Sequence, residues 1–139
     1  MTPDETMQEA AWWSAVADPA DPAARVVRAT LGDRRGREWL QGEWSGVPRE
    51  LRCAGEARWD QQWNRWRERA LAVDVERELA RVERAGGGFM TPADPRWPVQ
   101  LSCLGEEEPL GLWFLGRLSD SSQSEGHVSI VGARASPSA

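Results

Sequence analysis

Lysine is absent from this sequence of 139 residues, and cysteine, histidine and long apolar runs are scarce. All 17 positive side chains are therefore arginine, and the 22 aspartates and glutamates give the chain a net charge of -5. Proteins that bind nucleic acid with their whole surface carry a basic excess, because they displace counterions from phosphates. Any contact between this chain and phosphates must therefore be local.

No apolar stretch approaches the roughly 18 residues that a membrane span needs. The first residues, 1–5, are acidic and are not followed by the apolar segment of a secretory signal. We therefore expect a cytoplasmic protein without a membrane span.

The sequence contains few residues that could bind a metal or act in catalysis. Cys53, Cys103 and His127 are too few and too widely spaced for a usual zinc site, and a reducing cytoplasm disfavours a disulfide. The three consecutive carboxylates of residues 106–108 belong to a loop, where they point in different directions. No nucleophile and base stand in a catalytic pattern with His127. The sequence therefore predicts no cofactor, no metal and no enzymatic activity.

Residues 1–88 are predicted to form a mainly helical N-terminal domain. The first helix is expected over residues 9–17, with residues 1–8 frayed. Asp21 is the expected N-cap of the second helix and Pro22 its first residue, since proline has no N–H to leave unsatisfied there. Gly32 is expected to end that helix.

The strongest helical pattern extends from residue 49 to residue 84. Trp59, Trp63 and Trp66 recur at helical spacing and share one face with Ala70 and Val73. Tryptophans among arginines can also stack on unpaired bases, but this spacing favours core packing.

The periodicity of the pattern slips near Asp74. We expect Asp74 to cap a separate last helix, which ends at the glycines of residues 86–88.

Residues 89–118 are predicted to form a strand and turn region leading into a sheet. A short strand begins at Phe89, and one or two helical turns end at Gly105. Residues 110–115 form a candidate buried strand. Trp97 and Trp113 are both expected in the core.

Residues 119–139 combine a polar connector with the start of a further domain. The connector covers residues 119–126, and residues 127–132 form an apolar strand that enters a glycine turn. Arg134 follows that turn, so its guanidinium and neighbouring N–H groups could meet a phosphate. The sequence thus predicts an α+β fold.

The second half of the chain resembles the DNA-processing protein A (DprA) family, and the helical part is similar in architecture to the N-terminal domain of its actinobacterial members. The residues that carry the resemblance are Pro92-Ala93-Asp94, Trp97-Pro98, Leu101, Pro109-Leu110-Gly111-Leu112-Trp113, Gly116 and Ile130-Val131-Gly132-Ala133-Arg134 with Ala135-Ser136. The family pattern continues beyond these residues, so the chain resembles a C-terminally truncated member.

The resemblance implies a non-catalytic role in natural transformation and recombination, in which the protein binds single-stranded DNA and assists loading of the RecA recombinase. It implies a SAM-like helical domain followed by the first strand of a Rossmann-like domain. Gly132, Ala133, Arg134 and Ser136 would contact DNA phosphates. A homodimer is expected only for a full-length homologue.

Other functions stay open at this point. The acidic helical part could be a protein-interaction module, or the chain a remnant that binds no DNA. A nucleotide-hydrolysing Rossmann enzyme is less favoured, because the sequence holds no complete phosphate loop and no general base.

Overall fold

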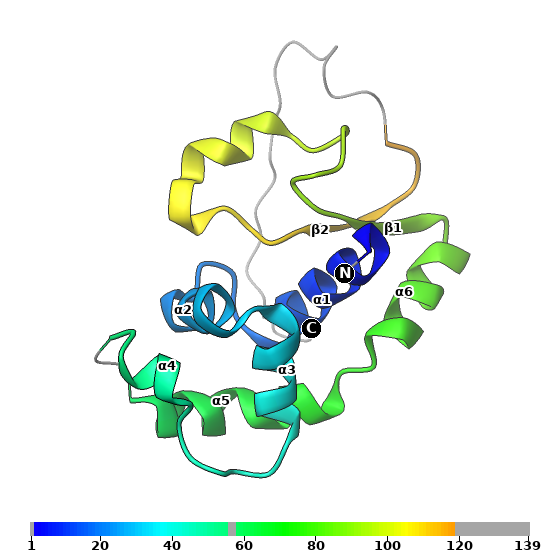
Figure 1. Ribbon diagram of the computed structural model, residues 1–139. Helices are drawn as coiled ribbons and strands as arrows, with labels where there is room; N and C mark the ends of the chain where they lie inside the picture. Colours follow the sequence, from blue (N-terminus) through cyan, green and yellow to red (C-terminus); the bar gives the residue numbers. More distant parts are fainter. Residues whose placement is uncertain (1, 56–57, 119–139) are drawn as a thin grey trace, which may run out of the picture.

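The computed structural model describes residues 2–55 and 58–118. Within these ranges the protein is an α+β fold, mostly helical, with a two-stranded antiparallel sheet that follows the helices (Figure 1). The helices are α1 (Pro3–Val16), α2 (Pro22–Leu31), α3 (Asp33–Gln41), α4 (Arg49–Arg52), α5 (Trp59–Ala72) and α6 (Val75–Arg84). The strands β1 (Gly87–Met90) and β2 (Leu112–Leu115) are separated by the 3-10 helix η1 (Val99–Glu107). None of the helices in the described ranges is long and apolar enough to cross a membrane.

Helix α1 begins six residues earlier than the sequence pattern predicts. Thr2 and Glu5 form a capping box, in which Glu5 N donates to Thr2 Oγ1 over 3.2 Å and Thr2 N donates to Glu5 Oε2 over 2.7 Å. These bonds satisfy two backbone donors that a frayed end would leave to water. Hydrogen bonding of Thr2 to the Glu5 carboxylate, from its backbone first, lowers the pKa of Glu5. The expected fraying of residues 1–8 is therefore wrong for residues 3–8.

The predicted helix boundaries at Asp21, Gly32 and Asp74 are confirmed. Asp21 Oδ1 accepts hydrogen bonds from the backbone N–H groups of Ala23 and Ala24, and α2 ends at Gly32 with φ of 84°. Asp74 Oδ1 accepts from Arg77 N over 3.0 Å at the start of α6. Asp74 thus separates α6 from α5, as predicted. The break between α4 and α5 is not predicted by the helical pattern of residues 49–84.

Tryptophan side chains make up much of the core around α1. This helix contacts α3, α5, α6 and β1, so it occupies the centre of the fold (Figure 1). Trp12 and Trp13 are fully buried, and Trp66 of α5 is 1% exposed. Trp59 and Trp63 are also buried, which confirms the core face predicted for α5.

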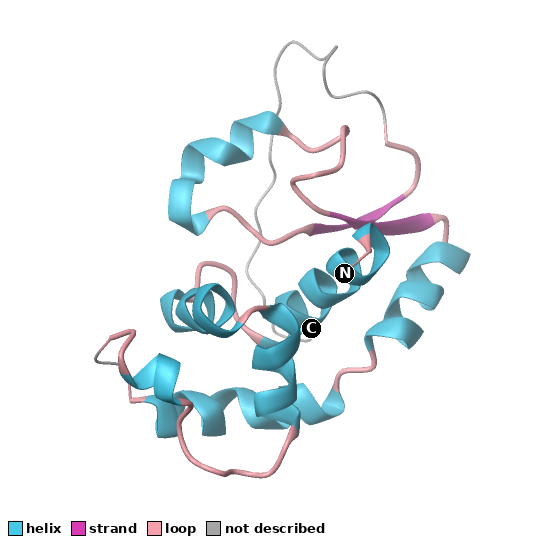
Figure 2. Cartoon of the chain, viewed as in Figure 1, coloured by secondary structure: helices cyan, strands magenta, loops and turns pink. Residues whose placement is uncertain are grey.

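The sheet packs against the ends of α1 and α6 (Figure 2). In its register Phe89 lies opposite Trp113, and their ring centroids are 4.9 Å apart. Phe89 joins the helical core and Trp97 is buried, as expected. Trp113 is 40% exposed and Leu115 71%, so the prediction of a buried strand is wrong for both side chains. Among the described residues β2 pairs with β1 alone, and no element covers these two side chains fully.

Candidate functional site

The residues predicted to contact DNA lie outside the described part of the chain. Gly132, Ala133, Arg134 and Ser136 all belong to residues 119–139. The DNA site of the sequence pattern therefore stays a prediction, and the described residues offer other candidate sites.

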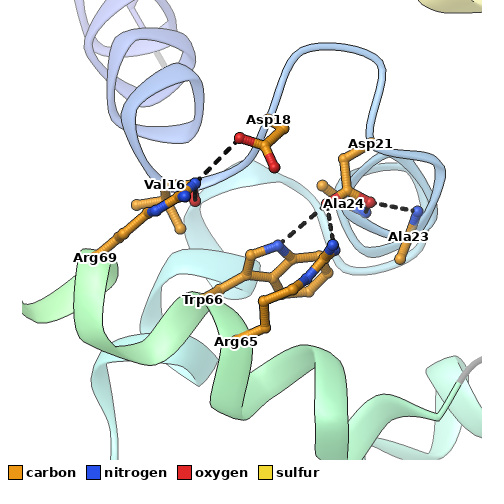
Figure 3. A network of polar contacts seen from close by, with 8 residues as sticks. All are labelled: Val16, Asp18, Asp21, Ala23, Ala24, Arg65, Trp66 and Arg69. Carbon is orange, nitrogen blue, oxygen red and sulfur yellow. Dashed lines mark hydrogen bonds and ion pairs between the residues drawn. The ribbon is translucent and has the colours of Figure 1, made fainter. Parts of the chain in front are cut away.

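Asp21 is the centre of a polar network that joins the loop between α1 and α2 to α5 (Figure 3). Its Oδ1 caps α2, while its Oδ2 accepts hydrogen bonds from Arg65 and from Trp66 Nε1, the latter over 3.2 Å. The Asp21 side chain is only 6% exposed. A buried carboxylate is costly unless it is paired and hydrogen-bonded, and this one has partners on both oxygens. Asp21 is thus a structural residue.

A second arginine of α5 holds the same loop. Arg69 Nη1 lies 3.2 Å from Asp18 Oδ1 and 3.4 Å from the carbonyl oxygen of Val16 (Figure 3). The contact with Val16 satisfies a carbonyl at the C-terminus of α1, which has no partner within the helix. Arg69 therefore fixes the position at which the loop leaves α1.

A pocket of about 130 Å³ opens beside this loop, between α1, α2 and the segment after η1. Its apolar wall is built mainly by Trp13, Ala17, Pro19, Ala24, Pro109 and Leu110. Sites for cofactors and drug-sized ligands usually measure about 300–1,000 Å³. This pocket is too small for a nucleotide and matches one side chain or one ring.

Charged groups of both signs surround the pocket. Arg28 is bound to Asp33 by two hydrogen bonds, of 2.9 and 3.0 Å. Arg25 donates to the carbonyl oxygen of Glu106 and lies 3.4 Å from its carboxylate. Glu108 Oε1 accepts from Trp97 Nε1 over 3.0 Å. Both arginines are therefore already engaged with carboxylates.

Asp94 and Arg96 lie in a tight turn before η1, within the segment that carries the resemblance described above. Asp94 accepts from the backbone N–H of Arg96 over 2.8 Å and from its guanidinium over 2.9 and 2.7 Å. The Arg96 side-chain hydrogen bond, followed by that of its backbone, lowers the pKa of Asp94 to about 2. The guanidinium also lies 5.6 Å from the ring centroid of Phe114 in β2. Asp94 thus holds Arg96, and Arg96 connects the turn to β2.

Two aromatic features are exposed although the sequence pattern does not predict their exposure. Trp44, in the loop after α3, is 45% exposed and packs edge-on against Trp63, with ring centroids 5.1 Å apart. Trp113 and Leu115 line a groove together with Val82 of α6 and with Ala85, the C-cap residue of that helix. A loop tryptophan and a strand of four residues carry no periodicity that would reveal which face solvent reaches.

Glu9 of α1 is a buried carboxylate with one partner. Its Oε1 lies 3.3 Å from Arg37 Nη1, while its buried Oε2 has no hydrogen-bond partner among the described residues. Burial raises the pKa of Glu9 and outweighs the attraction of Arg37. The folded protein therefore holds a proton on Glu9 more tightly than the unfolded chain does.

Replacing Glu9 with glutamine is expected to raise the free energy of unfolding at neutral pH. Because the pKa is higher in the folded state, the wild-type protein loses stability as pH rises from the ordinary glutamate pKa through the raised one. The glutamine variant lacks this loss. Urea denaturation at several pH values should show that the free energies of unfolding of the two proteins converge at low pH. If the variant became more stable relative to the wild-type protein as pH falls, the assignment would be contradicted.

Within residues 2–55 and 58–118 there is no group of three or more histidine, cysteine, aspartate or glutamate side chains that could hold a metal ion. Cys53 and Cys103 are exposed free thiols. Glu106 and Glu107 are exposed, as expected for a solvated segment, although they end η1 rather than lie in a loop.

Comparisons with known proteins add no assignment: no protein-family model matches the chain, and no curated protein or solved structure matches it at a significant level.

Proposed function

We propose that this chain is a DprA-like DNA-processing protein, which binds single-stranded DNA and helps to load a RecA-type recombinase during natural transformation and recombination. The observation that carries the proposal is the ordered set of motif residues from Pro92 to Arg134, placed after a helical domain. In this proposal the helical part is SAM-like, and residues 127–132 form the first strand of a Rossmann-like domain.

Several arginines of the helices are already held by carboxylates, which makes them poor candidates for a DNA contact. Arg28, Arg65 and Arg69 are each paired with an aspartate. An arginine held in this way must leave its carboxylate before it can neutralise a phosphate. Arg134 stands after an apolar run that ends at Gly132, where backbone N–H groups and a guanidinium can reach one phosphate together.

Replacing Arg134 with alanine is expected to weaken binding of single-stranded DNA about tenfold, since hydrogen bonds to charged groups contribute about 1.5–3 kcal/mol. The measurement is fluorescence anisotropy of a labelled oligonucleotide titrated with the full chain at several salt concentrations. The slope of log affinity against log salt should become shallower by roughly 0.7, the value for one phosphate contact on a single strand.

A matched control is Arg81→Ala, which removes an exposed arginine of α6 that pairs with Glu78 within the helix. This variant should bind DNA as the wild-type protein does. If the folded wild-type chain shows no preference for single strands over a duplex, or if both variants bind alike, the proposal fails. A protein-interaction module then becomes the leading alternative.

A further inference from the structure

The size of the pocket between α1, α2 and the segment after η1 limits what can enter it. Its volume of about 130 Å³ is close to that of an engineered protein cavity of about 150 Å³ that holds one benzene molecule. A single amino-acid side chain has these dimensions, whereas a nucleotide or a folded element does not. The pocket is therefore of a size to receive one side chain.

Apolar and charged side chains together line the pocket, and the exposed side chains of Asp18 and Glu106 mark its rim. Pro19, Pro109 and Leu110 are apolar lining residues that solvent reaches, and an aliphatic stem can pack against them. Four carboxylates and two guanidinium groups also line the pocket: Asp18, Asp21, Glu106 and Glu108 against Arg25 and Arg28. Their ion-pair partners beyond the lining are Asp33, Arg65 and Arg69, so five carboxylates face four guanidinium groups and the excess is one negative charge. The whole chain also carries a net charge of -5.

The carboxylates differ in how far they are already satisfied. Asp21 is buried and bonded at both oxygens, so it is not available to a ligand. Asp18 and Glu106 have side chains that are 56% and 85% exposed, and each forms its ion pair through one oxygen. Glu108 likewise accepts from Trp97 through Oε1 alone. Within the described residues, Asp18 Oδ2, Glu106 Oε1 and Glu108 Oε2 thus remain to accept hydrogen bonds from a donor.

We propose that this pocket binds one basic side chain, an arginine or a lysine, presented by a partner protein. The aliphatic stem packs against Pro109 and Leu110, and the cationic head meets Asp18, Glu106 and Glu108 at the rim. An acidic side chain is disfavoured because the committed arginines, Arg25 and Arg28, would have to leave their carboxylates to receive it. The pocket is thus a docking point for a partner protein, independent of any contact with DNA.

The test is a titration of the ¹⁵N-labelled full chain with capped tripeptides, followed by NMR. The probes are acetyl-alanyl-arginyl-alanine amide and its counterparts with glutamine or glutamate in the centre. The arginine peptide should cause saturable shifts, at millimolar concentration, in the indole N–H of Trp13 and in the amides of Arg25 and Leu110. The glutamine and glutamate peptides should leave these signals in place, and raising the salt should weaken binding of the arginine peptide.

Three variants distinguish binding in the pocket from general attraction of the peptide to the negative charge of the chain. Glu106→Gln removes a charge from a highly exposed side chain and is expected to weaken binding of the arginine peptide about threefold to fivefold, as for an exposed ion pair. Combining it with Asp18→Asn should weaken binding further. Glu78→Gln, on α6 and not part of the pocket lining, should leave binding unchanged. Equal shifts with the glutamine peptide, shifts confined to other residues, or equal losses in all three variants would overturn the proposal.

Discussion

Replacing Trp66 with alanine is expected to lower the free energy of unfolding by about 4 kcal/mol, the range for large aromatic residues in a core. Trp66 is 1% exposed, and its ring lies edge-on to that of Trp13 with centroids 6.4 Å apart. Its Nε1 also donates to Asp21 Oδ2, so the variant removes a hydrogen bond from a buried carboxylate. Because domains of this size are stable by only about 5–15 kcal/mol, much of the variant should be unfolded at moderate urea concentration.

Urea denaturation followed by far-UV circular dichroism measures this loss of stability. Two further variants serve as comparisons. Trp44→Ala removes a tryptophan that is 45% exposed and should cost much less. Trp66→Phe keeps most of the apolar volume but loses the hydrogen bond to Asp21, so its cost should lie between the other two. If Trp66→Ala were no more destabilising than Trp44→Ala, the central place of Trp66 in the core would be wrong.

The helical part could be predicted from the sequence where the signal is local. Asp21-Pro22 and Asp74 determine helix starts through hydrogen bonds to residues two and three positions away, and such bonds depend on neighbours along the chain. The start of α1 also has a local signal, since Thr2 and Glu5 match the capping-box spacing. The polar composition of residues 1–8 conceals this signal, because it is also typical of a frayed terminus.

The sheet and the pocket depend on contacts between distant residues and could not be predicted in this way. The apolar composition of residues 110–115 predicts that Trp113 is buried. Its exposure depends on which elements cover β2, and a strand of four residues is too short for its sequence pattern to reveal that. The ion pair of Asp18 with Arg69 and the contact of Arg25 with Glu106 each join residues more than 50 positions apart. The pocket results from these contacts together, and its acidic rim has no motif in the sequence.

Replacing Gly111 with alanine is expected to destabilise the protein by about 3 kcal/mol, the upper part of the usual range for overpacking. A Cβ atom on Gly111 would lie 2.1 Å from Cζ of Phe89 and 2.6 Å from the carbonyl oxygen of Met90. Phe89 is buried against the helical core and against Trp113, so its ring cannot move without opening β1 and β2. Gly111 therefore allows the two strands to approach each other.

Chemical denaturation of Gly111→Ala should be compared with that of Gly42→Ala. The nearest atom to a Cβ on Gly42 is the carbonyl oxygen of Glu38 at 3.1 Å, and φ at this position is -71°, which alanine adopts readily. The control should therefore change stability by less than about 1 kcal/mol, because a lower entropy of the unfolded chain offsets the mild contact. Adding Phe89→Leu to Gly111→Ala should cost less than the two single changes together, since the smaller side chain removes the ring from the clash. Strict additivity would show that Gly111 acts through something other than its contact with Phe89.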